Sequence, residues 1–484
     1  MQQLIASVGT ILSDYILVTV LLLTAIYFTI TTRGVQFRMI GEMFRLLIHS
    51  GKRDESSKAD DNSTVSSFQA FSLSIASRVG TGNMAGVATA IALGGPGAVF
   101  WMWVIALLGA ATAFIESTLA QLFKVRGAKS FMGGPAYYIQ KGLGNRPWAI
   151  CFALLITITF GFAFNSVQAN TIASAFNQSF EISPLVTGSV LTIATFIIIS
   201  GGIQRVSRFS EIVVPVMALA YLLLAIVIIG LNLNKMPQVM TMILTDAFNL
   251  NSAMAGTIGM GLIMGIKRGL FSNAAGAGST PNAAATANVS HPGKQGLIPA
   301  RGVYTDTLVV CSCTAFIILC SGVWGGGTDD GIVLTQKAID ADLGSGHNFG
   351  SIFVSIAILF FAFTSIVANY YYGETNLRFI RNSPGMITIY RLMVCALVMT
   401  GSLTTLNIVW GFADITMALM TLCNLGAIIL LAKYAITLLA DYSRQRKNGK
   451  NPVYTSDTLP QIKHLTECWS EKSADDDANL NEIK

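Results

Sequence analysis

Charged residues are scarce in this chain. Only 12% of its 484 residues are Asp, Glu, Lys or Arg, whereas a soluble domain usually has about 25%. The four histidines are scattered, and Cys311 and Cys313 lack the spacing of a zinc site, so no metal centre of that kind is expected. No nucleophile elbow or phosphate-binding loop stands out, which argues against an enzyme.

Hydrophobic residues are abundant instead. They make up 52% of the chain, and the mean hydropathy is +0.59. Apolar runs near the roughly 20 residues needed to cross a lipid bilayer recur throughout. They predict eleven helices, at 15–32, 66–93, 96–123, 147–170, 184–201, 208–231, 251–288, 300–324, 350–372, 385–406 and 408–433. The sequence therefore indicates an all-α membrane protein. Its first run lacks a basic leader and is expected to remain as a helix rather than be cleaved as a signal.

Lys and Arg gather in alternate loops. The segment from Arg33 to Lys58 and the loop from Lys124 to Arg146 are basic, while the loop 325–349 is mostly acidic. By the positive-inside rule, the N-terminus is expected outside and the C-terminus in the cytoplasm. The net charge of +6 then reflects topology, and no nucleic-acid partner is indicated. The polar tail after about residue 440 is predicted to be a mobile cytoplasmic extension.

One pattern occurs twice, each time inside a glycine-rich interruption of an apolar segment. Asn83 lies five residues after Arg78, Asn273 lies five residues after Arg268, and each Asn begins an Asn-x-Ala-Gly sequence. Paired interrupted helices in corresponding halves are typical of a secondary transporter's binding site. The predicted topology agrees, because helices two to six and helices seven to eleven run in opposite directions. The alternative is a coincidence between two Ala/Gly-rich stretches.

An interrupted helix must satisfy its freed backbone groups, because each unpaired group costs several kcal/mol in hydrocarbon. At Gly80 and Gly82, freed carbonyls can coordinate a hard cation such as Na⁺, and freed N–H groups can hold a carboxylate. An amino acid transported together with a cation meets both needs. The alternative is that these glycines only permit close packing of helices.

The run from Gly94 to Gly109 resembles the diagnostic stretch of the alanine or glycine:cation symporter family. Similar short stretches are Val79–Asn83, Ala85–Ala88, Gly133–Ala136, Lys267–Asn273 and Tyr371–Glu374. The resemblance covers roughly residues 60–440. It implies the leucine-transporter fold, with two inverted five-helix repeats after one extra N-terminal helix. The corresponding parts are 1–60 (extra helix and basic segment), 61–235 (first repeat), 236–440 (second repeat) and 441–484 (cytoplasmic tail).

The resemblance also implies a function, namely Na⁺-coupled uptake of small neutral amino acids, chiefly alanine or glycine, by alternating access. A bacterial plasma membrane is the expected location. A channel or passive pore for small solutes is the alternative, and a monomer is compatible with the sequence. The chain departs from the family pattern at Ala274, where an acidic residue is common, and at Asn369, where an aromatic is common. The second departure predicts a changed substrate pocket.

The resemblance places a Na⁺ site between the first interrupted helix and the ninth helix. Its five oxygens would come from the backbone of Ala76, Val79 and Phe361 and the hydroxyls of Thr364 and Ser365, although back-bonding within the helix is the alternative for the hydroxyls. The predicted substrate site comprises Gly80, Thr81, Gly82, Asn83, Gln168, Asn170, Phe271, Ser272, Asn273 and Asn369. Arg78 and Arg268 are expected to form ion pairs with Glu116, Asp306 or Glu374, or else to hold the substrate carboxylate.

Overall fold

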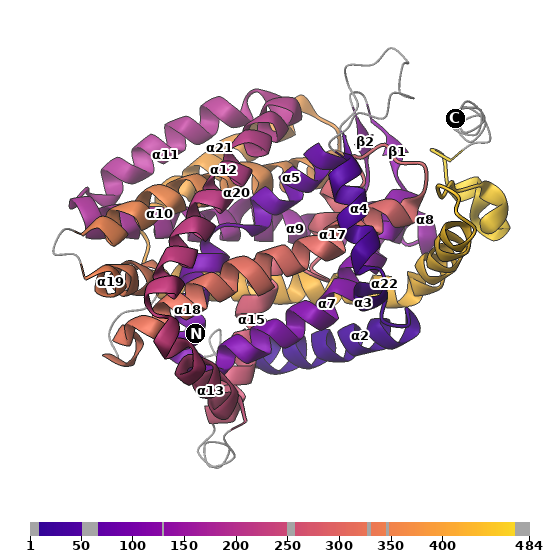
Figure 1. Cartoon of the computed structure of the whole chain (residues 1–484). Helices are drawn as coiled ribbons and strands as arrows, with labels where there is room; N and C mark the ends of the chain where they lie inside the picture. Colours follow the sequence, from indigo (N-terminus) through magenta and orange to yellow (C-terminus); the bar gives the residue numbers. More distant parts are fainter. Residues whose placement is uncertain are drawn as a thin grey trace.

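The protein is almost entirely helical (Figure 1). The computed structural model describes residues 9–50, 66–127, 130–248, 257–326, 331–344 and 348–469. Seven helices in these residues are long and apolar enough to cross a membrane, or eight if one bent pair is a single span. Within the described residues, each of the eleven predicted spans overlaps helical structure, so an all-α membrane fold of about eleven helices is consistent with the structure. Residues 475–477 and the basic residues after position 50 lie outside the described part.

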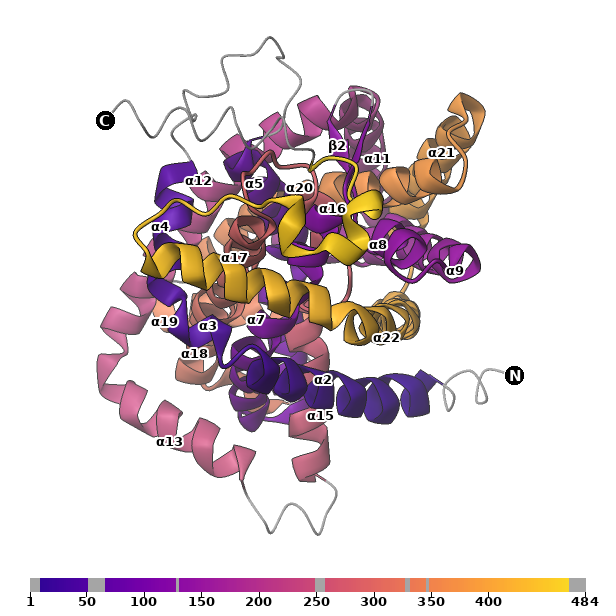
Figure 2. The ribbon, with the colours of Figure 1, turned by 90° about the vertical axis from the view of Figure 1, so that its right-hand side faces the viewer.

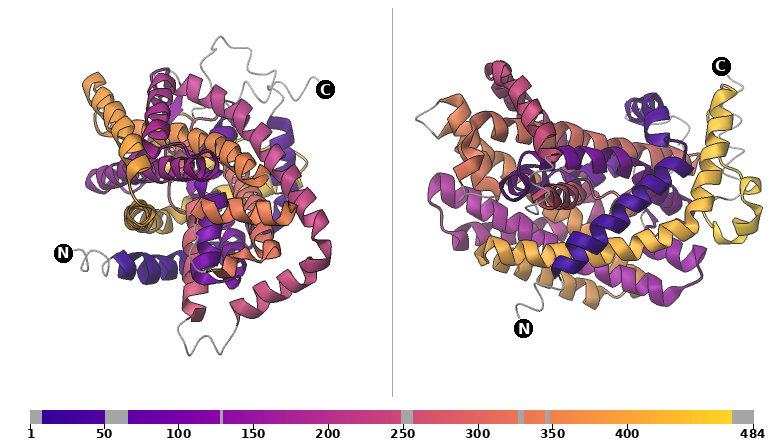
Figure 3. Two further views of the ribbon diagram at one scale, coloured as in Figure 1. Left: turned by 90° about the vertical axis from the view of Figure 1, so that its left-hand side faces the viewer. Right: turned by 90° about the horizontal axis from the view of Figure 1, so that it is seen from below.

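The N-terminal part begins with one apolar helix. The π-helical η1 (Ile11–Leu17) continues into α2 (Val18–Thr31), and two short helices follow, α3 (Val35–Arg38) and α4 (Ile40–Ser50). The helix formed by η1 and α2 packs against α7 and α22, and Figure 3 shows α2 beside the long C-terminal helix α22. The predicted basic segment after the first helix is partly helical. The apolar residues of its helix α4 lie mostly on one side, as in an amphipathic helix.

The first half of the chain contains the first interrupted helix. Its elements are α5 (Ser67–Arg78), η2 (Gly82–Gly86), α6 (Val87–Gly94), α7 (Gly97–Leu122), β1 (Val125–Arg126), β2 (Phe131–Met132), α8 (Pro135–Gly142), α9 (Arg146–Ile156), η3 (Thr157–Phe164), α10 (Asn165–Phe180), α11 (Pro184–Ile199) and α12 (Gly202–Leu231). A capping box starts α5, since Ser66 and Gln69 each bond the other's backbone N–H at 3.1 Å. The two strands form a small antiparallel hairpin.

The second half contains the second interrupted helix. Its elements are η4 (Leu233–Lys235), α13 (Met236–Ala247), α15 (Thr257–Asn273), α16 (Thr280–Ala284), α17 (Pro292–Val303), η5 (Tyr304–Cys311), α18 (Ser312–Ser321), η6 (Val323–Gly326), α19 (Gly331–Leu343), α20 (Phe349–Ile380), α21 (Pro384–Leu403), α22 (Leu406–Lys447), η7 (Ser456–Thr458) and η8 (Pro460–Leu465). The helices α12 and α13 meet at 72°. The short helices α13 and α19 were not predicted, because their apolar runs are too short to suggest a span. In Figure 1 they lie at the end opposite the β hairpin.

The C-terminal segment 450–469 packs across the end that carries α8 and the β hairpin (Figure 2). Tyr454 donates its N–H to the Ser290 carbonyl at 2.9 Å, and the Trp469 indole donates to the Gln121 carbonyl at 3.1 Å. The prediction of a mobile tail was therefore wrong for residues 441–469. The side chains of Leu459 and Ile462 explain the difference. They are buried and stabilise the packing of this segment, although its average composition is polar.

Lys124 illustrates how tightly this segment is packed. Its ammonium group lies 4.1 Å from the ring centre of Phe131 and 4.8 Å from that of Trp469, and it donates to the Ala287 carbonyl. Burial lowers the pKa of Lys124 to about 7. The aromatic faces compensate part of the cost of burying this charge.

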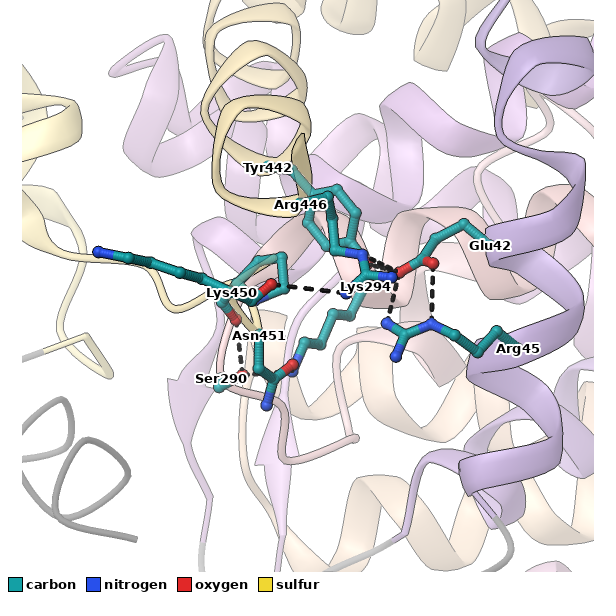
Figure 4. Close-up of polar contacts among 9 residues, drawn as sticks. Glu42, Arg45, Ser290, Lys294, Tyr442, Arg446, Lys450 and Asn451 are labelled. Carbon is teal, nitrogen blue, oxygen red and sulfur yellow. Dashed lines mark hydrogen bonds and ion pairs between the residues drawn. The ribbon is translucent and has the colours of Figure 1, made fainter. Parts of the chain in front are cut away.

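Glu42 joins α4 to the end of α22 (Figure 4). Its carboxylate accepts hydrogen bonds from Arg45 and from the Tyr442 hydroxyl, both at 2.6 Å, and lies 3.2 Å from Arg446 Nε. Burial alone would raise the pKa of Glu42, but these partners outweigh burial and hold the pKa below its ordinary value. Beside this junction, Lys294 donates to Asn451, and Ser290 donates to the Pro452 carbonyl.

We expect Glu42→Gln to lower the free energy of unfolding by roughly 1 kcal/mol at neutral pH, because it weakens charge-assisted hydrogen bonds at a partly buried site. A lowered pKa in the folded state adds stability above the ordinary pKa of a carboxyl group, and this stability disappears as the pH falls through the lowered value. Thermal unfolding in detergent at several pH values measures the effect. The exposed Asp457→Asn is the control. An equal loss at neutral and strongly acidic pH would contradict an ionic role for Glu42.

Candidate functional site

The first break in the helices is only two residues long. Helix α5 ends at Arg78, Val79 is extended, and the chain is helical again from Thr81. Gly82 therefore lies in a π-helical turn rather than in the break, and neither Gly80 nor Gly82 has a positive φ. A Cβ on Gly82 would lie 3.0 Å from both Phe271 Cδ1 and Ser272 Cα. The glycine at position 82 thus permits close contact between the two interrupted helices.

The second break begins directly after the three residues that were predicted to lie at it. Phe271, Ser272 and Asn273 form the last turn of α15, and the non-helical residues are 274–279. Three of these residues have positive φ: Ala274 at 54°, Gly276 at 86° and Gly278 at 84°. This is a longer departure from helix than the first break. Its backbone groups therefore need partners from neighbouring helices.

A buried polar cluster joins the two breaks. The Asn83 amide donates to Ser272 Oγ at 3.2 Å and to Asp306 Oδ1 at 2.7 Å, while its oxygen accepts the Gly80 N–H at 3.0 Å. Ser272 donates to Asp306 Oδ2 at 2.5 Å. Asp306 is fully buried in η5. The charge of Asp306 within an apolar run suggested an ion pair with Arg78 or Arg268, but its contacts with Asn83 and Ser272 were not predicted.

Gln168 and Asn170 have different surroundings. Gln168 Oε1 accepts the backbone N–H of Thr81 at 3.0 Å and its hydroxyl at 2.6 Å, so it contacts the first break directly. The Asn170 amide instead donates to the carbonyls of Gly401 and Thr404, at 3.1 and 2.5 Å. The structure thus brings Gln168 to the predicted site and places the Asn170 amide against the end of α21.

Two further predicted residues, Asn369 and Asn273, have different partners. The Asn369 amide oxygen accepts the Ser77 hydroxyl at 2.7 Å, and its amide donates to Asn165 Oδ1 at 3.2 Å. The Asn273 amide donates to the Thr307 hydroxyl at 3.2 Å, and its oxygen accepts the Ala275 N–H at 3.0 Å. Asn369 therefore adjoins the first break, whereas Asn273 caps the end of α15.

Phe271 lies within an aromatic cluster. Its ring centre is 4.4 Å from that of Phe164 and 4.6 Å from that of Trp410. Arg268 stacks on Trp410 at 4.0 Å and forms two hydrogen bonds with Asp414, at 3.1 and 3.0 Å. The sequence did not single out Phe164 or Trp410, because their local pattern is that of ordinary membrane-helix residues. Asp414 was also missed, although a charge within the predicted span 408–433 was the available signal.

The predicted cation ligands converge at the first break. The Ser365 hydroxyl lies 2.8 Å from the Ala76 carbonyl, 3.0 Å from that of Phe361 and 3.4 Å from that of Val79. The Thr364 hydroxyl bonds the Phe361 carbonyl of its own helix at 2.9 Å. These are uncharged oxygen donors, the kind that suits a hard monovalent cation. Helix α20 supplies both hydroxyls, and the end of α5 supplies two carbonyls.

The expected ion pairs do not form among the described residues. Arg78 donates to the Pro299 carbonyl at 3.2 Å and to the Thr280 hydroxyl at 2.5 Å, rather than pairing with Glu116 or Asp306. Glu374 pairs with Arg378 one turn away on α20. Arg78 therefore ties the end of α5 to the segment after the second break.

Comparison with known proteins identifies the family of this chain. A sequence model of the sodium:alanine symporter family matches residues 1–456. The chain belongs to this family. It is therefore an integral membrane transporter rather than an enzyme, and it carries out sodium-coupled amino-acid transport.

Relatives of this family member align over nearly its whole length. The probable sodium/glutamine symporter GlnT of Bacillus subtilis (strain 168) is 45% identical over 487 residues, covering 100% of both chains. The amino-acid carrier protein AlsT of the same organism is 47% identical over 475 residues, covering 98% of this chain and 99% of its own. The crystal structure of MhsT in complex with L-phenylalanine is similar in fold, with a TM-score of 0.57 at 16% identity, and covers 85% of this chain and 94% of its own. This confirms the leucine-transporter fold.

Proposed function

We propose that this symporter couples Na⁺ influx to the uptake of a small neutral amino acid, chiefly alanine or glycine, by alternating access. One observation carries the proposal: the cation ligands and the substrate residues share the first break. The Val79 carbonyl faces Ser365, while the next two residues, Gly80 and Thr81, contact Asn83 and Gln168. Ordering this short segment by one ligand favours binding of the other, which is the basis of coupling.

The close packing around the breaks favours a small substrate. Gly80 and Gly82 lie against Ser365 and Phe271, so little volume separates the two interrupted helices. Asn83, Gln168 and Ser272 would orient the amino and carboxylate groups, and Phe271 would contact the side chain. Glutamine is a further candidate, because GlnT is described as a probable sodium/glutamine symporter.

The proposal includes the orientation of the chain in the membrane. The C-terminal segment lies across the end of the molecule that carries α8 (Figure 2). In this segment, Glu467 pairs with Lys141 and Trp469 contacts Lys124. The positive-inside rule favours a cytoplasmic location for this basic end. We infer a bacterial plasma membrane with the N-terminus outside.

Uptake into proteoliposomes tests this function. Labelled alanine, glycine and glutamine are supplied separately, with an inward Na⁺ gradient, with equal Na⁺ on both sides, and with K⁺ replacing Na⁺. The symporter should accumulate alanine or glycine above the external concentration only with the gradient. Equal rates in all three conditions, ending at the external concentration, would instead identify a passive pore.

Phe271→Ala should admit larger neutral amino acids and weaken selection for the smallest. Removing the ring opens space between Phe164 and Trp410, where the Phe271 ring now packs. One or two methylene groups in such a pocket change selectivity by about 10- to 200-fold. Competition of leucine or methionine with labelled alanine measures the change. Phe180→Ala, on an exposed surface, is the control. An unchanged competition profile at a normal uptake rate would show that Phe271 does not contact the substrate.

A further inference from the structure

The backbone of the second break is anchored by one buried carboxylate, that of Glu116 on α7. Glu116 Oε1 accepts the N–H of Gly276 at 3.2 Å, and Oε2 accepts the N–H of Gly278 at 3.1 Å. Both glycines have positive φ, so their N–H groups are outside any helix. The Glu116 side chain is fully buried. Backbone donors turned toward one point form a site for an anion, and here the protein's own carboxylate fills it.

Asn424 on α22 completes this anchor. Its amide donates to Glu116 Oε2 at 3.0 Å and to the Gly276 carbonyl at 2.9 Å, so both polar backbone groups of Gly276 are held. The Asn424 oxygen accepts the Tyr138 hydroxyl from α8 at 2.5 Å. The break is therefore fastened to α7, α22 and α8 by a continuous chain of hydrogen bonds.

No Lys, Arg or His forms an ion pair with Glu116 in the part of the chain that the structure describes. Hydrogen bonds from the break and from Asn424 stabilise the buried carboxylate, together with a longer-range electrostatic attraction from Arg78. Two residues before Gly276, the chain leaves α15 at Ala274, directly after Phe271, Ser272 and Asn273. A shift of Gly276 therefore moves the end of α15.

We propose that Glu116 is a positioning residue that sets amino-acid affinity without touching the amino acid. It holds residues 276–278 and thereby fixes the end of α15 relative to Gly82 and Asn83. This inference rests on the proposed function only for the identity of the substrate whose affinity changes. That Glu116 holds the backbone of the second break follows from the hydrogen bonds themselves.

Glu116→Gln tests the proposal, because an amide of nearly the same size places an N–H donor against backbone donors. Two quantities are measured on purified full-length protein: equilibrium binding of labelled L-alanine in saturating Na⁺, and hydrogen exchange of peptides covering 274–284. We expect at least a tenfold rise in the dissociation constant and faster exchange in those peptides, with little change in α20. Wild-type affinity and wild-type exchange in Glu116→Gln would overturn the proposal, as would weaker binding with unchanged exchange at 274–284.

Asp340→Asn is the matched control. Asp340 also accepts two backbone N–H groups, those of Gly350 at 2.7 Å and Ser351 at 3.2 Å, but these bonds join α19 to the start of α20 and hold neither break. This variant should bind alanine normally. A general loss of stability would lower binding in both variants equally and would contradict a specific role for Glu116.

Two milder variants keep the test decisive if Glu116→Gln does not fold. Glu116→Asp retains the charge but shortens the reach, and Tyr138→Phe removes only the outermost hydrogen bond. Each should raise exchange at 274–284 and weaken alanine binding less than Glu116→Gln is expected to. Normal exchange and binding in both would overturn the proposal. If wild-type protein binds no alanine, the substrate assignment fails, while the exchange measurement still decides whether Glu116 holds the break.

Discussion

Ser365→Ala should raise the Na⁺ concentration needed for half-maximal uptake by roughly 10- to 100-fold, because an interaction with a charged group contributes about 1.5–3 kcal/mol. The Ser365 hydroxyl is central among the proposed cation ligands, since it lies within 3.4 Å of the carbonyls of Ala76, Val79 and Phe361. Alanine removes this oxygen and leaves the helix intact. Initial uptake rates of alanine across a series of Na⁺ concentrations measure the change.

Thr364→Ala is the informative comparison for this substitution. The Thr364 hydroxyl bonds only the Phe361 carbonyl one turn earlier in its own helix, which is ordinary back-bonding. Its loss should raise the Na⁺ requirement less than the loss of the Ser365 hydroxyl, and the double variant should be the most affected. A normal Na⁺ response in the double variant, with both Thr364→Ala and Ser365→Ala, would eliminate this cation site.

Gly80→Ala should abolish most transport, although it adds a single methyl group. A Cβ at this position would collide with the Ser365 hydroxyl and lie 3.0 Å from Gln168 Oε1, so it displaces a cation ligand and a substrate residue together. Overpacking of this kind costs about 1–3 kcal/mol, which corresponds to roughly a 5- to 150-fold loss of affinity. Binding of labelled alanine and the Na⁺ dependence of uptake should both weaken.

Gly86→Ala is the matched control for Gly80→Ala. Gly86 ends the π-helical turn that follows the first break, but a Cβ there has no neighbour closer than 3.8 Å. The added methyl group should therefore leave both affinities near the wild-type values. If Gly80→Ala transports normally, or if the two variants lose affinity equally, then the contacts of Gly80 are not what the site depends on.

The membrane architecture could be predicted because it depends on composition and length. Apolar runs of about 20 residues specify spans whatever surrounds them, and the doubled Asn-x-Ala-Gly pattern located both breaks to within a few residues. The convergence of Ala76, Val79, Phe361, Thr364 and Ser365 was predicted through resemblance to a known family. The contact between Asn83 and Ser272 joins residues 189 positions apart, and the doubled pattern pointed to both of these residues.

Details that depend on tertiary contacts could not be predicted. A pattern of glycines suggests a flexible backbone, but it does not reveal that Gly82 is helical and small because Phe271 lies against it. Charges in apolar runs suggest ion pairs, yet Glu116 bonds to backbone N–H groups whose orientation only the folded break defines. The C-terminal segment is polar on average, so the few apolar side chains that anchor it, such as Ile462, were not distinguished.

The most direct test of coupling at the first break is equilibrium binding of labelled alanine to purified wild-type protein, with Na⁺ absent and at saturation. Because the proposed cation site and the proposed substrate site share residues Val79 and Gly80, alanine should bind much more tightly in Na⁺. By thermodynamic linkage, alanine must then increase Na⁺ affinity by the same factor. Equal alanine affinity with and without Na⁺ would contradict the proposal that both ligands bind at this break.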